Sequence, residues 1–277
     1  MIIVFELFLL AVLLLVMWHL YRLRRRIRED RNEFDRQMTR LQSQNDHLQD
    51  TGLKLWELKE ALEKEQEKSA RLLRNILPEK VIRDLQEKGE STPERYENVA
   101  VFFADIVNFT GIAPELDPQK LILELSEIFS EFDRIFASCG CERIKTIGDA
   151  YMAVAGLQNQ ENNVCENMLR AAIAVRDYLD QRNRQTFGQK WVMRFGINAG
   201  TVVGGIVGRD KYLYDIFGDT VNIASRLEHA SEAMKINVSR QVYDQTSGKF
   251  DFTARGLIEV KGRGKIEMFF LDGEKTV

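Results

Sequence analysis

Two apolar stretches, residues 99–111 (VAVFFADIVNFTG) and residues 143–154 (RIKTIGDAYMAV), decide how this chain folds. Each is a strand-like run that one aspartate ends or interrupts, Asp105 in the first and Asp149 in the second. A buried carboxylate costs free energy unless an opposite charge compensates it. A pair of divalent cations would compensate both carboxylates, and carboxylates that hold Mg²⁺ against nucleotide phosphates form a phosphoryl-transfer site. The two stretches therefore predict such a site.

The sequence around these stretches mixes helix-like and strand-like segments. A helix is predicted over residues 118–138, with Asp117 as N-cap and Pro118 in the first helical position. Residues 142–146 and 150–155 predict a hairpin with Asp149 at its tip. Further helices are predicted over residues 163–183 and 220–233, and strands over 191–198, 202–207, 212–216, 236–238, 250–253, 257–260 and 267–271. This order predicts an α+β domain over residues 99–277, with a ferredoxin-like sheet and additions.

Composition excludes some classes of function. The chain has 277 residues and a net charge of −3, so no basic surface indicates a nucleic-acid partner. Its three cysteines are Cys139, Cys141 and Cys165, an odd set without metal-ligand spacing. We expect them to stay reduced in a cytosolic compartment.

The N-terminal residues 2–21 are almost wholly apolar, interrupted by Glu6 and His19 near the two ends. About 20 such residues in a helix span the hydrocarbon core of a bilayer. A cluster of arginines follows at once and should stay on the cytoplasmic side: Arg22, Arg24, Arg25, Arg26 and Arg28. The alternative is a cleaved signal peptide, but the run lacks a basic region before it and a small-residue cleavage site.

We therefore predict a transmembrane helix over residues 1–21 of a single-pass membrane protein whose remaining residues are cytoplasmic. Only Met1 precedes the apolar run, so no sensor domain is expected on the other side of the membrane. This organisation predicts either a membrane-embedded regulatory partner or a longer parent protein.

Residues 22–75 predict a basic segment followed by a coiled coil. One apolar column repeats at every seventh position: Phe34, Leu41, Leu48, Leu55 and Leu62. The companion column is weak, because Gln37, Gln44 and Thr51 occupy it before Leu58 and Leu72 restore it. We expect a marginal parallel dimer with a soft point at Gly52, and a solvated single helix is the alternative.

A junction over residues 76–98 connects this rod to the globular domain. The rod ends at LLRNILP, residues 72–78, because Pro78 cannot continue the preceding helix. A short amphipathic helix over residues 79–87 and a loop over 89–94 are predicted next.

Three further groups of residues are candidates for chemistry. Backbone N–H groups of the segment Asn108, Phe109, Thr110 and Gly111, directly after Asp105, could cradle phosphate oxygens. Lys145 lies two residues after Arg143 and four before Asp149, and an even offset on a strand puts side chains on one face. Asn222 and Arg226 lie four residues apart on a predicted helix, where an amide and a guanidinium could clamp ribose and phosphate. On spacing alone, the phosphate-binding segment is a weak signal, a lysine on a strand is normally just solvated, and ordinary surface polarity is the better interpretation of Asn222 and Arg226.

Taken together, four segments resemble the catalytic domain of class III nucleotidyl cyclases, in order and over residues 99–272. They are FADIVNFT (103–110), KTIGDAYM (145–152), YDIFGDTVNIASR (214–226) and VKGRG (260–264). The stretch LLRNILP also resembles the helical transducing element that precedes these domains in the family.

The resemblance implies a role for each matching residue. Asp105, Asp149 and the Ile106 carbonyl would hold two Mg²⁺ or Mn²⁺ ions, one lowering the pKa of the ribose 3′-hydroxyl and one neutralising the triphosphate. Asn222 would orient the ribose, and Arg226 would stabilise charge on the α-phosphate in the transition state. Lys261 and Arg194 match the family's contacts to the remaining phosphates.

The purine base is expected to be adenine. Lys145 can donate to N1 of adenine and Asp215 can accept from its N6 amine, whereas guanylate-specific members carry Glu and Cys at these positions. In the family the metal aspartates come from one subunit, and the base-selecting pair, Asn222, Arg226 and Lys261 come from the other. Every required position is present, so the resemblance implies an adenylyl cyclase that converts ATP as a homodimer. The alternatives are a guanylyl cyclase and a catalytically silent membrane coiled-coil scaffold.

Overall fold

The computed structural model describes residues 2–74, 76–158, 163–186, 188–208, 212–260 and 262–276, without the side chains of residues 2–9, 11 and 74. It divides into two compact units, Met1–Asn75 and Ile76–Val277. The positions of the two units relative to one another are not determined.

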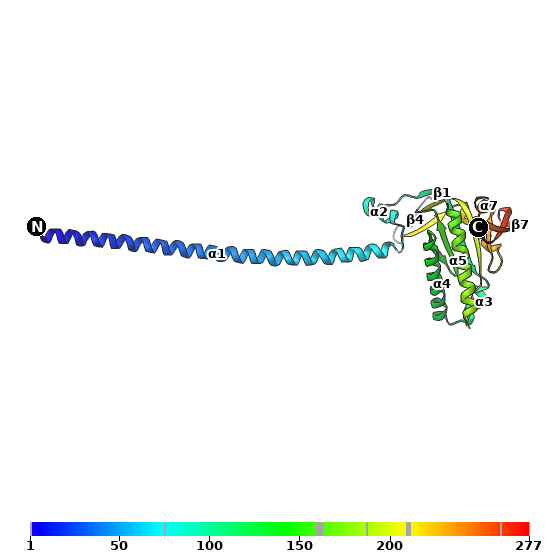
Figure 1. The fold of residues 1–277 in the computed structure, drawn as a ribbon, viewed down its shortest axis with the longest axis horizontal. Helices are drawn as coiled ribbons and strands as arrows, with labels where there is room; N and C mark the ends of the chain where they lie inside the picture. The colour runs from blue at the N-terminus through cyan, green and yellow to red at the C-terminus, as the bar shows by residue number, and fades with distance from the viewer. Residues whose placement is uncertain are drawn as a thin grey trace. The chain divides into compact units, whose positions relative to one another are not determined.

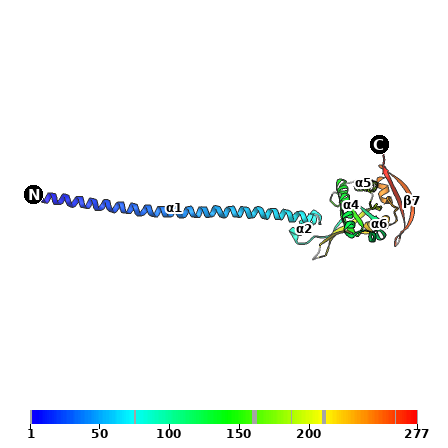
Figure 2. The same ribbon diagram turned by 90° about the horizontal axis from the view of Figure 1, so that it is seen from below.

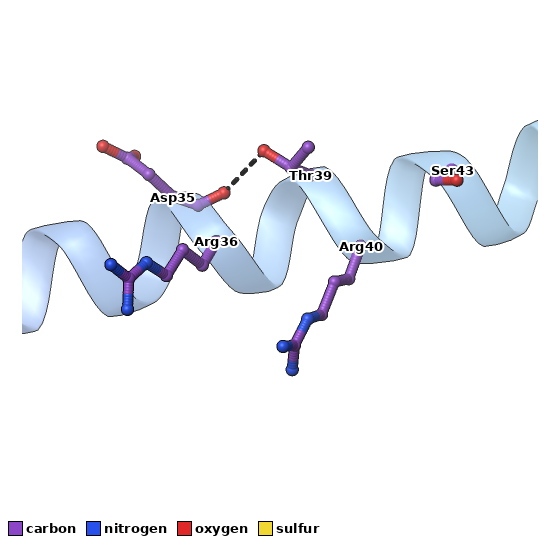
Figure 3. A pocket seen from close by; sticks show the side chains of 5 residues that line it. All are labelled: Asp35, Arg36, Thr39, Arg40 and Ser43. Atoms are coloured by element: carbon purple, nitrogen blue, oxygen red, sulfur yellow. Dashed lines mark hydrogen bonds between the residues drawn. The ribbon is translucent and has the colours of Figure 1, made fainter.

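The first unit is one helix, α1 (Ile2–Arg74), 73 residues long (Figure 1). The helix runs without interruption through Gly52, and the heptad column is exposed at Phe34, Leu41, Leu48, Leu55 and Leu62. Figure 3 shows one hollow, lined by Asp35, Arg36, Thr39, Arg40 and Ser43, in which Thr39 Oγ1 donates to the Asp35 carbonyl over 2.8 Å. The residues around it all belong to the same helix, so the hollow is a groove between successive turns.

The predicted transmembrane helix over residues 1–21 is not confirmed. No helix within the described part of the chain is long and apolar enough to cross a membrane. Met1 lies outside the described residues, as do the side chains of residues 2–9 and 11, which make up much of the predicted span.

The second unit is built on an eight-stranded sheet, and its α+β class agrees with the prediction. Its centre comprises β1 (Glu94–Ile106), β2 (Cys141–Ile147), β3 (Ala150–Ala155) and β4 (Met193–Val207), in the order β2-β3-β1-β4. Helix α4 (Pro118–Ser138) connects β1 to β2, and α5 (Val164–Gln185) connects β3 to β4. This βαββαβ succession with antiparallel neighbours is the ferredoxin-like arrangement.

The remaining elements extend this centre. β5 (Leu213–Phe217) pairs with the end of β4, and β6 (Ile236–Ser239), β8 (Gly264–Glu274) and β7 (Phe250–Val260) continue the sheet beyond β4. The short helices are α2 (Glu79–Lys88) before β1, α3 (Phe109–Ile112) and the 3₁₀ turn η1 (Ala113–Glu115) between β1 and α4, α6 (Asp219–His229) between β5 and β6, and α7 (Arg240–Thr246) between β6 and β7.

Helices cover both faces of the sheet. Alternate residues of β1, such as Phe102, point to the face that carries α4 and α5, which lie side by side in Figures 1 and 2. There Phe102 meets Phe136 of α4 edge to face, with ring centroids 4.9 Å apart, and both rings are fully buried. Burying each such ring stabilises the fold by roughly 1.5–3 kcal/mol. The intervening residues, such as Val101 and Phe103, point to the opposite face, where residues of α2 and α6 pack.

Several boundaries differ from the sequence predictions. The helix predicted over 118–138 is confirmed at both ends, and Asp117 caps it by accepting from the Lys120 N–H over 3.0 Å. By contrast, the two strands predicted over 191–198 and 202–207 are one strand, β4, and those over 250–253 and 257–260 are one strand, β7. Helix α6 ends at His229 rather than at residue 233, and α7 was not predicted.

Candidate active site

Asp105 and Asp149 lie together at one end of the central strands. In the β1–β3 register Ala104 is opposite Tyr151, so Asp105 reaches the turn that Gly148 and Asp149 form. Gly148 adopts a φ of 64°, a conformation that glycine adopts without strain. Burial, and then repulsion from the Asp105 carboxylate, raises the pKa of Asp149 above its ordinary value, while the N–H groups of Asp149 and Ile106 act in the opposite direction.

This pair fits a divalent cation. Two neighbouring carboxylates supply the hard oxygen ligands that Mg²⁺ prefers. A cation bound to both would offset the repulsion that raises the pKa of Asp149. The described residues contain no group of three or more His, Cys, Asp or Glu side chains that could hold a metal. Other oxygens, such as backbone carbonyls, phosphates and water, would therefore complete the coordination. The Ile106 carbonyl, predicted as one such ligand, belongs to the last residue of β1.

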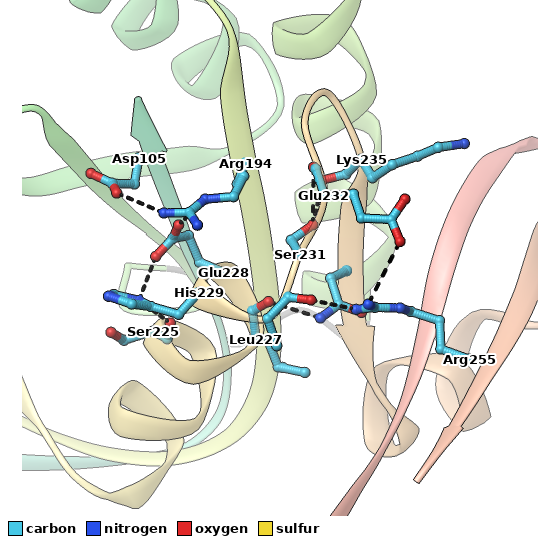
Figure 4. A network of polar contacts seen from close by, with 12 residues as sticks. Asp105, Arg194, Ser225, Leu227, Glu228, His229, Ser231, Glu232, Lys235 and Arg255 are labelled. Carbon is cyan, nitrogen blue, oxygen red and sulfur yellow. Dashed lines mark hydrogen bonds and ion pairs between the residues drawn. The ribbon is translucent and has the colours of Figure 1, made fainter. Parts of the chain in front are cut away.

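Arg194 is the cation that stands beside Asp105 in this structure (Figure 4). It lies directly opposite Asp105 in the β1–β4 register, and its Nη2 donates to Asp105 Oδ2 over 3.1 Å. Its Nε lies 3.2 Å from Glu228 Oε1 on α6, and Glu228 Oε2 lies 2.7 Å from His229 Nδ1. One guanidinium thus bridges the candidate metal ligand and a second carboxylate, which the sequence analysis did not identify.

The buried position of Glu228 destabilises the charged form of its carboxylate. Its side chain is 3% exposed, and burial raises its pKa to about 7 despite the opposing attraction of His229 and Arg194. Glu228 Oε1 and Arg194 Nε are both buried, and neither has a hydrogen-bond partner of good geometry among the described residues, although they lie within ion-pair distance. A buried charge of this kind is a feature of functional sites.

The predicted base-selecting residues also come together. Lys145 Nζ on β2 forms an ion pair with Asp215 Oδ2 on β5, seventy residues along the chain. The pair is largely shielded from solvent, and the Ile216 N–H donates to Asp215 Oδ1 over 2.9 Å. The structure therefore fixes a donor and an acceptor side by side.

The expectation that Arg143 shares a face with Lys145 is wrong. A β-bulge between Arg143 and Lys145 shifts the register of β2 against β3, so the even offset no longer preserves the face. Arg143 lies opposite Ala153 and forms an ion pair with Asp133 of α4 over 3.3 Å. Lys145 lies opposite Met152 and points to the other face, where Asp215 lies.

Asn222 and Arg226 lie on the exposed side of α6, while Ala224, Leu227 and Glu228 are buried. The four-residue spacing puts the amide and the guanidinium on one face, as expected for a helix. The helix can lie this close to β4 because of Gly196, where a Cβ would meet Glu228 N at 2.1 Å and Ala224 O at 2.6 Å.

Of the two predicted phosphate-binding segments, the structure describes residues 108–111 completely and the segment around Lys261 only in part. Asn108 has a φ of 59° and precedes the single turn of α3, and the Gly111 N–H donates to the Asn108 carbonyl over 3.0 Å. Phe109 packs against the core, whereas Thr110 and Gly111 are exposed. Lys261 lies outside the described residues, but the turn that follows it is tied to the start of α6 by an ion pair between Arg263 and Asp219.

Comparison with known proteins gives one consistent family. Residues 91–273 match the family described as the adenylate and guanylate cyclase catalytic domain. The soluble guanylate cyclase gcy-34 of Caenorhabditis elegans is 34% identical over 216 residues, which cover 76% of this chain and 31% of that protein. An adenylate cyclase of Mycobacterium bovis is 34% identical over 216 residues, 78% of this chain and 48% of that protein. The chain thus spans less than half the length of these relatives.

Solved structures agree with this result. The guanylate cyclase domain of RhGC from Catenaria anguillulae, in complex with GTP, has a TM-score of 0.62 at 33% identity and is covered completely by 66% of this chain. The adenylyl cyclase CyaB from P. aeruginosa has a TM-score of 0.62 at 28% identity, over 67% of this chain and 98% of that one. Proteins described as acting on either nucleotide are therefore about equally similar to this chain.

Proposed function

Because this chain belongs to the adenylate and guanylate cyclase catalytic-domain family, we propose that it is an adenylyl cyclase that converts ATP to 3′,5′-cyclic AMP and pyrophosphate. The observation that carries the choice of ATP is the contact between Lys145 and Asp215. The family alone does not make this choice, since the relatives described above include both kinds of cyclase.

The chemistry of the two purines explains why this pair favours adenine. Adenine presents an acceptor at N1 and a donor amine at C6, which match the ammonium of Lys145 and the carboxylate of Asp215. Guanine presents a donor at N1 and an acceptor at C6, so each of its groups would face a protein group of the same kind. Placing two purine groups against protein groups of the same kind in a shielded site would cost several kcal/mol, which is enough to select one base.

The metal ligands of the proposed enzyme are Asp105 and Asp149, with the Ile106 carbonyl as a further oxygen. When bound there, two divalent cations acidify the ribose 3′-hydroxyl and neutralise charge on the triphosphate. The protein's own contribution is to hold the two carboxylates at the ends of paired strands. Oxygens of the nucleotide phosphates would supply further ligands to cations held there.

Four other residues act on the nucleotide in this proposal. Asn222 orients the ribose, and Arg226 stabilises charge on the α-phosphate as the 3′-oxygen attacks in line. Arg194 and Lys261 bind the remaining phosphates, and the backbone of Phe109, Thr110 and Gly111 lies next to the metal carboxylates. Both Asn222 and Arg226 are exposed, so a nucleotide can reach them from outside the chain.

We propose that the enzyme is a homodimer whose sites are each completed by both chains. Two cross-strand apolar pairs of the β4–β5 hairpin support this, Val203 with Phe217 and Val207 with Leu213, because all four side chains are 39–53% exposed. Adjacent exposed apolar side chains of this kind mark interaction surfaces. The exposed heptad column of α1 supports the parallel coiled coil in the same way.

Membrane attachment through residues 1–21, with a membrane-embedded regulatory partner, stays a prediction from the apolar run and the arginines after it. Fractionation of cells that express the full chain, compared with a chain lacking residues 1–21, tests it. The prediction fails if the full chain is recovered without membranes.

The decisive experiment measures cyclic nucleotide production by the purified full chain in Mn²⁺, with ATP or GTP in parallel, and with Asp105→Asn as the control. Cyclic AMP from ATP alone, lost in the control, supports the proposed metal site and the choice of ATP. Cyclic GMP from GTP overturns the base assignment and keeps the two-carboxylate mechanism. No product from a folded chain that binds nucleotide favours the regulatory scaffold.

A further inference from the structure

The guanidinium of Arg194 contacts a carboxylate that the proposed mechanism assigns to the metal ions. It donates to Asp105 over 3.1 Å from the strand position directly opposite, so the contact follows from the register of β1 and β4 rather than from a mobile side chain alone. Both side chains are about three-quarters shielded from solvent, so their attraction is stronger than that of a surface pair. A divalent cation that binds Asp105 must compete with this attraction.

Glu228 fixes the other side of the same guanidinium. Its Oε1 lies 3.2 Å from Arg194 Nε, the atom nearest the backbone in the guanidinium group, while Arg194 Nη2 faces Asp105. Gly196 lets α6 approach β4 closely enough for this contact, since a Cβ there would overlap the backbone of Glu228. A buried carboxylate is expensive, and holding Arg194 is a function that accounts for its position.

We infer that Arg194, positioned by Glu228, is the internal counter-ion of Asp105 in the unloaded enzyme, and that a divalent cation must displace it from the carboxylate. The inference rests on the proposed metal site at Asp105 and Asp149. Once displaced, the guanidinium is available to a triphosphate oxygen while Glu228 still holds its Nε. Glu228 is then a positioning residue that acts through Arg194, and metal and nucleotide binding are linked through one side chain.

Binding of Mn²⁺ without nucleotide tests the inference, because it does not depend on turnover. Free Mn²⁺ is measured by electron paramagnetic resonance during titration of the full chain at pH 8. We expect Arg194→Gln to bind Mn²⁺ about 3- to 10-fold more tightly than the wild type, because a partly buried competitor worth about 1 kcal/mol is removed. Arg194→Lys keeps the charge and should stay within about twofold of the wild type.

The inference is overturned if folded Arg194→Gln binds Mn²⁺ no more tightly than the wild type. Circular dichroism and thermal unfolding establish folding, and Arg194→Met, of similar length, replaces the Gln variant if that variant does not fold. Asp105→Asn separates two kinds of failure. If Asp105→Asn binds Mn²⁺ as tightly as the wild type, the proposed metal site is wrong, and the proposed function with it. If Asp105→Asn weakens Mn²⁺ binding but Arg194→Gln leaves the affinity unchanged, only this inference is overturned.

A double-mutant cycle tests the role of Glu228. If Glu228 acts through Arg194, Glu228→Gln should change Mn²⁺ affinity at least twofold in the wild-type background and leave it unchanged in the Arg194→Gln background. Equal effects in both backgrounds would overturn the positioning role.

Discussion

At the scale of single residues, the proposed choice of base depends on Lys145 and Asp215. We predict that the double variant Lys145→Glu, Asp215→Cys will prefer GTP, because Glu accepts from guanine N1 and the thiol donates to O6. The ratio of kcat/KM for ATP to that for GTP should fall by at least about 100-fold, since two hydrogen bonds are exchanged. Cyclic nucleotide production with each substrate measures this ratio.

The single variant Lys145→Glu is the matched control for this exchange. It puts two carboxylates side by side in a shielded site, so we expect it to lose activity with ATP without gaining activity with GTP. If the double variant keeps the wild-type preference while remaining folded, these residues do not select the base.

Glu228 predicts a pH dependence of stability. Its folded pKa of about 7 lies above the ordinary 4.5, so the folded state binds the proton more tightly than the unfolded state. The free energy of unfolding should therefore fall as the pH rises from about 4.5 to 7, by on the order of 3 kcal/mol in total from this group. Glu228→Gln cannot titrate, so urea unfolding at pH 5, 6 and 7 should show a smaller loss than in the wild type. Parallel pH profiles for the two chains would contradict this.

The contacts of Glu228 and Arg143 show where residue-level prediction from sequence ends. Glu228 is an acidic residue among the buried positions of α6, and the sequence alone can signal such a buried carboxylate. Its partner cannot be predicted in this way, because Arg194 lies 34 residues earlier in another element. The face of Arg143 was predicted wrongly because a β-bulge leaves no mark in the sequence of one strand. Asp105 and Asp149, by contrast, stand out in apolar runs.

At the scale of elements, the position of α6 depends on Gly196. We predict that Gly196→Ala will destabilise the fold by about 1–3 kcal/mol, because the added Cβ overlaps backbone atoms of Ala224 and Glu228, which cannot move independently of the helix. A displaced α6 also moves Asn222 and Arg226, so cyclase activity should fall by more than the unfolded fraction explains. Gly248→Ala meets nothing within 4 Å and serves as the control, with a stability change within about 0.5 kcal/mol. Equal unfolding curves for the two variants would show that α6 tolerates the displacement.

Elements with strong local signals were predicted well, and those shaped by distant contacts were not. α4 has an N-cap aspartate, a proline at its first position and a regular apolar face, so both its ends follow from the sequence. The two strands predicted over residues 191–198 and 202–207 are one strand, β4, which continues through Gly200 with a φ of 153° beside Thr220. α7 has only seven residues, too few for a clear helical period, although Ser239 caps it by accepting from the Val242 N–H.

At the scale of the whole molecule, the proposed enzyme divides each site between two chains. Asp105→Ala removes a metal ligand and Arg226→Ala removes a transition-state contact, so each homodimer should be inactive. A mixed dimer has one site in which both defects meet and one site with neither. With random exchange half of the dimers are mixed and each has one intact site, so mixing the two variants should restore about a quarter of wild-type activity.

A mixture of Asp105→Ala with Asp149→Ala is the control, because it shows whether mixing two inactive variants restores activity without complementary halves of the site. Both defects lie in the half of the site that one chain supplies, so every site in every dimer lacks a metal ligand and the mixture should stay inactive. The exposed pairs of the β4–β5 hairpin and the heptad column of α1 are the surfaces on which such dimers would form. If the first mixture stays inactive while sedimentation shows mixed dimers of folded chains, the active site lies within one chain.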